Sequence, residues 1–304
     1  MSRPHLRTIR RRQVRPQQIR RLLLSAVLTL LVPLGGQAAE VGPERGRLVI
    51  VGGGGNIDPI LHRFVEMAGG RGASIVVIPT ASGAPSYDDF HSAARWFRDE
   101  AGVENVTVLH TYDRTEADSE AFVKPIREAQ AVWFPGGRQW RLADSYLGTR
   151  TQREIEALLA RGGIVGGSSA GATIQGSYLA RGHSAENTTM MGDHEEGFGF
   201  LRDVAIDQHL LRRNRQFDLI AVIESHPELL GIGIDEGAGI IVTGDTFEVV
   251  GGYVAIYDNQ KQLPNNGKFY LLRSGDRYNL ATRQASRPGL STSEFSKVKE
   301  QAWR

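Results

Sequence analysis

A serine among small residues is the first group in this sequence that could do covalent chemistry. Residues 163–172 are a short apolar run followed by glycine, serine and alanine, and 167–171 fit the G-x-S-x-G pattern centred on Ser169. In such a strand-to-helix turn the central serine takes a sparsely allowed backbone conformation, so its neighbours must be small. The pattern predicts Ser169 as a nucleophile, with the N–H of Ala170 directed at a developing oxyanion. The alternative is a glycine-rich turn in which Ser168 and Ser169 have no chemical role.

A serine hydroxyl is a weak nucleophile until a general base takes its proton, and a histidine base needs an acid to orient it. Two of the eight histidines, His110 and His209, end predicted strands and could reach the site. The candidate acids at strand ends are Asp207, Asp235 and Glu236. These carboxylates could equally be solvated charges at a sheet edge, since acidic side chains are mostly exposed. The residues alone therefore leave both the base and the acid open.

Three arginines, Arg212, Arg213 and Arg215, follow His209 within two helical turns. Guanidinium groups bind carboxylates through two parallel hydrogen bonds, so a basic cluster beside a base could hold an acidic substrate. The alternative is a solvated basic face, which is what runs of charge usually form.

The first 39 residues have the composition of a secretory signal peptide. Residues 1–21 hold eight arginines and no acidic residue, 22–34 are mainly apolar, and small residues follow. This order is typical of export signals, and the apolar run is shorter than the ~20 residues of a membrane-spanning helix. We expect cleavage after Ala38 or Ala39 and an exported protein, periplasmic or extracellular, without a stable membrane anchor. An uncleaved anchor and a basic nucleic-acid-binding arm are the alternatives.

The formal net charge of the whole chain is +2, from 36 basic and 34 acidic residues. Without residues 1–39 the chain keeps 28 basic residues against 34 acidic ones, a net charge of −6. The basic pI therefore gives no argument for binding nucleic acid, and we expect no nucleic-acid partner. The chain has no cysteine, which excludes disulfides, thiolate zinc sites and a cysteine nucleophile. We expect neither a metal nor a cofactor.

Strands and helices alternate in the first half of the chain. Apolar strands are predicted at 47–51, 74–78, 106–109, 131–134 and 163–167, and helices at 58–67, 88–102, 119–129 and 151–160. This alternation predicts an α/β fold with a mostly parallel, doubly wound sheet. Three glycine-containing segments follow strands, so they meet at the carboxyl edge where such sheets bind ligands; they are 52–55, 135–137 and 166–171. The first of them lacks the complete dinucleotide fingerprint, and we interpret it as a tight turn that brings backbone close to a site.

The second half is less regular. Residues 182–200 are polar without periodicity and predict a long loop over the site. A strand at 204–207 leads to His209, and a helix is predicted at 216–226. Further strands are predicted at 231–235, 239–242, 246–250, 253–257 and 268–273. The last three indicate antiparallel additions at one edge of the sheet, which is a candidate homodimer surface. We therefore divide the chain into a signal peptide (1–39), a single α/β domain (40–280) and a polar, loosely packed tail (281–304).

Four blocks of sequence, in order, resemble the cyanophycinase family of serine peptidases. This family is related to peptidase E (aspartyl dipeptidase) and has a fold like that of class I glutamine amidotransferases. The blocks are 134–139, 166–172, 207–210 with the arginines after it, and 233–236, within a resemblance that covers roughly 45–260. The resemblance implies a Ser-His-Glu triad, with Ser169 as nucleophile, His209 as base and Glu236 as orienting acid.

The resemblance also implies roles around the triad. The N–H of Gly137 would join that of Ala170 in stabilising the oxyanion. The substrate-binding residues that it implies are Gln139, Asp207, Gln208, Arg213 and Arg215. Cyanophycinases cut a polymer with a polyaspartate backbone and an arginine on each β-carboxyl, and they release β-Asp-Arg dipeptides. Asp207 would suit the substrate's guanidinium, and the arginines would suit its backbone carboxylates.

Two positions depart from the family pattern after the histidine. Leu210 stands where the family has phenylalanine, and Asp218 stands where it has an arginine. We expect an exported serine exopeptidase that degrades cyanophycin through an acyl-enzyme. An acid in place of an arginine changes how a substrate is oriented, so other aspartyl or isoaspartyl peptides are an alternative substrate class. A non-catalytic exported binding protein on the same scaffold is the other alternative.

Overall fold

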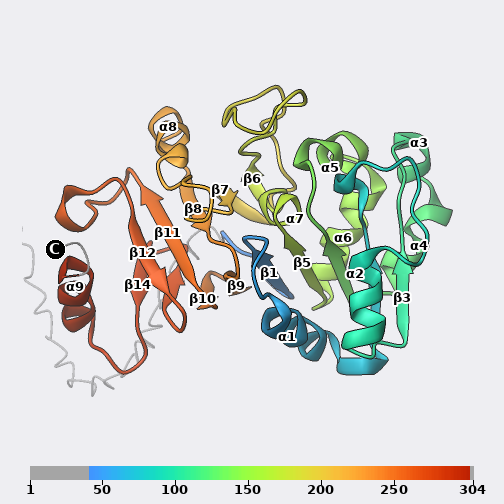
Figure 1. Cartoon of the computed structure of the whole chain (residues 1–304), viewed down its shortest axis with the longest axis horizontal. Coiled ribbons are helices and arrows are strands. Elements are labelled where there is room, and N and C mark those ends of the chain that lie inside the picture. Colours follow the sequence, from blue (N-terminus) through green and yellow to red (C-terminus); the bar gives the residue numbers. More distant parts are fainter. Residues whose placement is uncertain (1–40, 302–304) are drawn as a thin grey trace, which may run out of the picture. The chain divides into compact units, whose positions relative to one another are not determined.

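The computed structural model describes residues 41–301, and its main sheet has nine strands in the order β14-β13-β10-β9-β1-β5-β4-β2-β3 (Figure 1). The parallel part consists of β1 (Arg47–Val51), β5 (Ile164–Ser168), β4 (Ala131–Phe134), β2 (Ser74–Val77) and β3 (Asn105–Val108). The antiparallel part consists of β9 (Gly239–Thr243), β10 (Thr246–Val250), β13 (Arg277–Asn279) and β14 (Gln284–Ser286). The predicted α/β fold, with a mostly parallel sheet and antiparallel strands added at its C-terminal edge, is confirmed.

Helices cover both faces of the parallel part. One face is covered by α1 (Asp58–Ala68), α2 (Ser92–Arg95) and the π-helical turn Trp96–Glu100. The other face is covered by α4 (Glu120–Glu128), α5 (Gln139–Tyr146) and α6 (Arg150–Ala160). Strand β1 shows why both faces are needed: Val49 and Val51 pack in the first layer, whereas Leu48 and Ile50 pack in the second. A strand whose successive side chains point to opposite faces must be buried on both when all of them are apolar.

A second sheet of five strands, which the sequence did not indicate, has the order β12-β11-β8-β7-β6. Its strands are β6 (Gly176–Tyr178), β7 (Leu201–Gln208), β8 (Leu230–Ile234), β11 (Tyr253–Asp258) and β12 (Tyr270–Arg273). The first three pair in parallel, and β11 and β12 are antiparallel additions. One face packs on the core of the main sheet through residues such as Ile206 and Ile232, and the other is covered by α8 (Asp218–Ser225). Helix α8 begins two residues later than predicted.

The prediction that 246–273 form one antiparallel edge is therefore wrong. Strand β10 lies inside the main sheet, between β9 and β13, while β11 and β12 belong to the second sheet. The chain passes between the two sheets at Gly251, whose φ of +83° and close approach to the Gly237 carbonyl oxygen admit only glycine. Of the segments considered for a homodimer, only β12 has an unpaired edge among the described strands.

The described part of 281–304 is packed, contrary to the prediction of a loose tail. Strand β14 extends the main sheet, and α9 (Thr292–Gln301) buries Phe295 to 1% exposure. The Arg287 guanidinium lies 5.1 Å from the centre of the Phe295 ring and pairs with the buried carboxylate of Asp276. One aromatic residue in a polar segment gives no periodicity to detect, so its contacts were not predictable.

The remaining helices are short and lie in connections. They are α3 (Arg114–Ala117), α7 (Ala170–Thr173) and 3-10 turns at Gly70–Gly72, Thr80–Ser82 and Pro264–Asn266. The predicted signal peptide lies outside the described residues. Within 41–301 no helix has both the length and the apolar composition to span a membrane.

Candidate active site

The turn after β5 holds Ser169 in a strained backbone conformation. Ser169 has φ 57° and ψ −112° and precedes α7, and its N–H donates to the Val51 carbonyl oxygen at 2.9 Å. A Cβ added at Gly167 would lie 2.2 Å from the backbone oxygen of Gly171, and one at Gly171 would lie 2.0 Å from that of Phe134. The glycines are therefore required by close backbone packing, and a strained serine presented by such a turn is typical of a nucleophile.

Two hydrogen bonds link Ser169, His209 and Glu236. The Ser169 hydroxyl lies 2.9 Å from His209 Nε2, and His209 Nδ1 lies 2.7 Å from Glu236 Oε1. The second sheet positions the last two, because His209 directly follows β7, Glu236 follows β8, and these strands pair in register at Gln208 and Ile234. A carboxylate that accepts from Nδ1 leaves Nε2 free to take the proton of the serine.

The other candidates for base and acid lie in different contacts. His110 Nδ1 lies 2.8 Å from the Thr80 hydroxyl, not from Ser169. Asp235 Oδ1 accepts from the N–H groups of Leu211 and Arg212, at 2.9 and 3.0 Å, and so fixes the turn that follows His209. Of the candidates that the residues left open, His209 and Glu236 are the ones brought to Ser169.

The glycine run after β1 makes room for the linked side chains. A Cβ added at Gly53 would lie 2.5 Å from His209 Cε1 and 2.9 Å from Nε2, and one at Gly54 would lie 2.4 Å from the Glu236 carboxyl carbon. Both glycines have positive φ, +92° and +50°. The backbone of this run therefore lies against the imidazole and the carboxylate, as expected for a turn that approaches a site.

The turn after β4 lies close to Ser169. A Cβ added at Gly136 would lie 3.3 Å from Ser169 Cβ. The following residue, Gly137, has φ 144°, and a Cβ there would lie 2.1 Å from the Ala81 carbonyl oxygen. Within residues 41–301 neither Gly137 N–H nor Ala170 N–H donates a hydrogen bond to a protein acceptor. The oxyanion role expected of these two amides therefore stays a prediction.

The surroundings of His209 favour its neutral form. Burial lowers the pKa of His209; the hydrogen bond with Glu236 opposes this effect, and the Arg213 guanidinium adds to it, so that the net shift is downward from the ordinary value for histidine. Arg213 Nε lies 3.9 Å from Glu236 Oε1, and its side chain is about half exposed. A neutral imidazole at working pH is the form that accepts a proton.

The residues expected to bind substrate are mostly buried. Arg215 Nη1 donates to the side-chain and main-chain oxygens of Gln208 at 2.9 and 3.2 Å. The Gln139 side chain is 1% exposed, and its Nε2 donates to the carbonyl oxygens of Ala180 and Arg181. In this structure the Gln139 amide nitrogen therefore anchors the chain segment that enters the 182–200 loop, and its contact with substrate stays a prediction.

Asp207 is fully buried and paired with a residue that the sequence analysis missed, Arg181. Arg181 is at the start of a polar segment without periodicity, and 26 residues separate it from Asp207, so no local pattern indicated the pair. Arg213, with a side chain that is about half exposed, is the one expected substrate-binding residue that is not buried.

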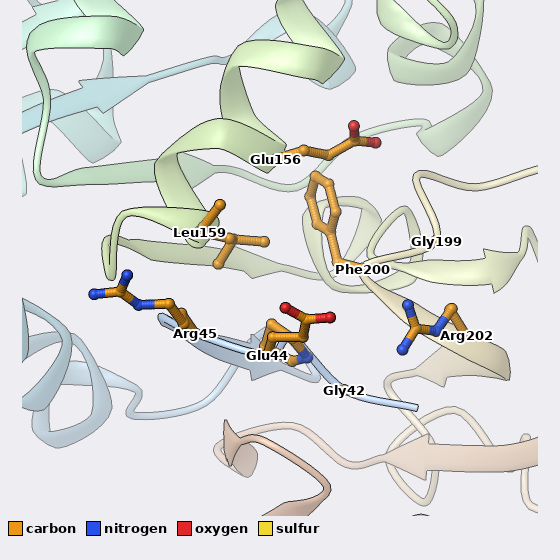
Figure 2. A pocket seen from close by; sticks show the side chains of 10 residues that line it. Gly42, Glu44, Arg45, Glu156, Leu159, Gly199, Phe200 and Arg202 are labelled. Atoms are coloured by element: carbon orange, nitrogen blue, oxygen red, sulfur yellow. The ribbon is translucent and has the colours of Figure 1, made fainter. Parts of the chain in front are cut away.

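A separate pocket of about 320 Å³ lies at the other end of the parallel strands. Figure 2 shows that its lining comes from the segment before β1, from α6, and from 199–202, including Glu44, Glu156 and Phe200. Because Ser169 follows the carboxyl end of β5, this pocket has no part in the site. Among the described residues no group of three or more His, Asp or Glu side chains could hold a metal ion.

Comparison with known proteins identifies the family. The sequence pattern of Peptidase family S51 matches residues 48–250. The chain belongs to this family. It is 34% identical over 246 residues to a cyanophycinase from Geminocystis herdmanii, covering 74% of this chain and 89% of that one. It is 35% identical over 250 residues to a cyanophycinase from Thermosynechococcus vestitus, covering 74% and 75%.

Solved structures of peptidases have a similar fold. A peptidase from an acI-B1 Actinobacterium superposes with a TM-score of 0.59 at 25% identity, over 80% of this chain and 98% of that one. A putative peptidase E protein from Listeria monocytogenes superposes with a TM-score of 0.50 at 17% identity, over 68% and 98%, and shows the fold alone. The protein is a serine-type peptidase, and its resemblance to the cyanophycinase family is confirmed.

Gly53→Ala should lower the kcat/KM of this peptidase by about 10²-fold, because the new methyl group displaces the His209 ring from Ser169. The measurement is peptide hydrolysis together with a thermal melt. Gly70→Ala is the matched control, since Gly70 has a similar positive φ of 77° but nothing within 4 Å of an added Cβ. It should cost about 1 kcal/mol of stability with little change in activity. Equal activity in the two variants would contradict the predicted clash between a methyl group at position 53 and the His209 ring.

The pH profile of kcat/KM should fall on the acid side as His209 gains a proton, with a midpoint on the acid side of the ordinary histidine pKa. Arg213→Gln removes a cation that lowers the pKa of His209, so the midpoint should move to higher pH, and the shift should be small because the Arg213 side chain is about half exposed. Arg212→Gln is the matched control and should leave the midpoint in place. A midpoint that stays or moves to lower pH in Arg213→Gln would exclude this electrostatic link.

Proposed function

We propose that this protein is an exported serine exopeptidase that hydrolyses cyanophycin to β-Asp-Arg dipeptides through an acyl-enzyme on Ser169. The observation that carries the proposal is the pair of hydrogen bonds from Ser169 through His209 to Glu236. The naming of the two relatives as cyanophycinases supports the substrate class. The composition of residues 1–39 supports export to the periplasm or the medium.

Acylation begins when His209 Nε2 takes the proton of the Ser169 hydroxyl and Oγ attacks the carbonyl carbon of the scissile bond. The carbonyl oxygen becomes an oxyanion, which accepts hydrogen bonds from the N–H groups of Ala170 and Gly137. Glu236 stabilises the imidazolium that forms and holds it in one orientation. His209 then returns the proton to the leaving amine, and the C–N bond breaks.

Deacylation repeats these steps with water. His209 takes a proton from the water, the hydroxide attacks the ester carbonyl, and the proton goes back to Ser169 Oγ as the ester bond breaks. In both steps His209 alone carries the proton, while Glu236 and the two amides only stabilise the charges that form. The substrate must therefore be held in place by groups other than those that carry out the chemistry. Among them, the exposed Arg213 guanidinium suits a carboxylate of the polyaspartate backbone.

The test is incubation of the purified chain, without residues 1–39, with cyanophycin, with the products identified by mass. We expect β-Asp-Arg to accumulate. A panel of Asp-X and β-Asp-X dipeptides in parallel separates this activity from the second candidate function, a dipeptidase for other aspartyl or isoaspartyl peptides. Asp218 and the pairing of Asp207 favour that second candidate. Intact polymer together with cleaved dipeptides would replace the first proposal by the second.

A further inference from the structure

The acidic residue nearest in sequence to the predicted base, Asp207, forms an internal ion pair with Arg181. Asp207, two residues before His209, is 0% exposed, and the Arg181 side chain is 2% exposed. Arg181 Nε donates to Asp207 Oδ1 at 2.7 Å, and its Nη2 donates to Oδ2 at 3.0 Å. This is the bidentate geometry in which a guanidinium satisfies both oxygens of a carboxylate. Oδ1 also accepts the N–H of Gln208 at 2.9 Å.

Arg181 is held in this place by its own backbone and by further acceptors. Its N–H donates to the Met190 carbonyl oxygen at 3.0 Å, and its carbonyl oxygen accepts from the buried Gln139 side chain. Its Nη1 donates to the Asn187 carbonyl oxygen at 3.0 Å, and its Nη2 also donates to Asp218. The guanidinium cannot leave Asp207 without also breaking its hydrogen bonds to Asn187 and Asp218, both of which are partly buried.

A second guanidinium could not bind Asp207 while Arg181 is present. Both carboxylate oxygens already accept charge-assisted hydrogen bonds, and a substrate cation would lie against a like charge in a site from which water is excluded. Displacing Arg181 would leave its own charge buried and unpaired, which is strongly unfavourable. The departure at position 218 belongs to the same cluster, because the Asp218 carboxylate is the second anion that Arg181 holds.

We infer that Arg181 is a specificity-determining residue, which takes the position on Asp207 that a substrate guanidinium would need, so that the enzyme recognises the aspartyl backbone and not the arginine. The inference rests on the proposed function and defines its substrate class. Aspartyl peptides that carry a neutral group on the β-carboxyl are cleaved as readily as those that carry arginine. Recognition of the backbone carboxylates falls to exposed cationic groups such as Arg213.

The test compares two oligomers of the polyaspartate type, one with arginine on each β-carboxyl and one with citrulline, whose ureido group has nearly the same shape without the charge. We expect kcat/KM values within about 3-fold of each other. A preference for the arginine oligomer of about 30-fold or more, the range expected for a buried charge pair with substrate, would overturn the inference. Cleavage of neither oligomer would overturn the proposed function instead.

Binding of the two dipeptides, β-Asp-Arg and β-Asp-citrulline, to the Ser169→Ala chain decides the inference without turnover. Calorimetry should give affinities within about 3-fold, whereas a 30-fold preference for β-Asp-Arg would overturn it; no binding of either dipeptide would count against the proposed function instead. Arg181→Met frees Asp207 and should raise the preference for the arginine ligand by about 10-fold or more. Arg181→Lys keeps a cation there and should leave the two ligands equivalent. If Arg181→Met does not fold, the wild-type comparison stands as the test.

Discussion

Ser169→Ala should lower kcat for cyanophycin, the proposed substrate, by about 10⁴-fold or more, which is the loss expected when an activated serine is removed from a serine peptidase. The Ser169 hydroxyl has a base 2.9 Å away, and this imidazole cannot replace the nucleophile. The measurement is dipeptide release under single-turnover conditions, so that a slow residual rate is detected.

Ser168→Ala is the matched control for this variant. Ser168 is the adjacent residue, ends β5 and has no side-chain hydrogen bond within the described residues, so its replacement should change kcat by less than about 3-fold. Similar losses in both variants would mean that the turn is disturbed as a whole. A full loss of kcat in Ser168→Ala, with Ser169→Ala unaffected, would show that Ser168 and not Ser169 is the nucleophile.

Glu236→Gln lowers kcat by about 10⁴-fold while the side chains keep their places. The glutamine amide can donate to His209 Nδ1, which places the imidazole proton on Nε2, where it blocks the acceptance of the serine proton. The glutamine also removes the negative charge that stabilises the imidazolium. The measurement is kcat together with thermal stability, which should change little because Glu236 is partly exposed and its hydrogen-bonding shape is kept.

Asp235→Asn is the control for Glu236→Gln. Asp235 accepts two backbone N–H groups through one oxygen, a role that the asparagine carbonyl oxygen can keep, so kcat should fall by less than about 10-fold. A loss below 10-fold in Glu236→Gln would show that this carboxylate does not orient the base.

The regular part of the fold was predictable because its signals are local. The apolar strand β1 and the glycines after β5 are continuous in sequence, and strand–helix alternation fixes a parallel sheet whose carboxyl ends converge. The resemblance to cyanophycinases supplied the choice of His209 and Glu236, which the residue types alone left open. In the structure His209 lies within hydrogen-bond distance of Ser169, and Glu236 lies within hydrogen-bond distance of His209.

What was missed depends on contacts between distant segments. The split of the C-terminal strands between two sheets follows from a backbone turn at Gly251 that has no pattern of its own. Arg181 pairs with Asp207 and Asp218, which lie 26 and 37 residues further along the chain. Nothing in the sequence near Arg181 distinguishes it from other polar residues at the start of a loop. Gln139 matched the family motif at its position, but its burial depends on the segment that packs over it.

The most direct test of the account is reaction of the chain with a fluorophosphonate, followed by peptide mapping by mass. Only a serine activated by a neighbouring base reacts with such a reagent at a useful rate. The account predicts one adduct, located on Ser169, which disappears in Ser169→Ala and is formed much more slowly when His209 is replaced by glutamine. An unlabelled chain, or an adduct on Ser168, would contradict the claim that Ser169 is the activated nucleophile.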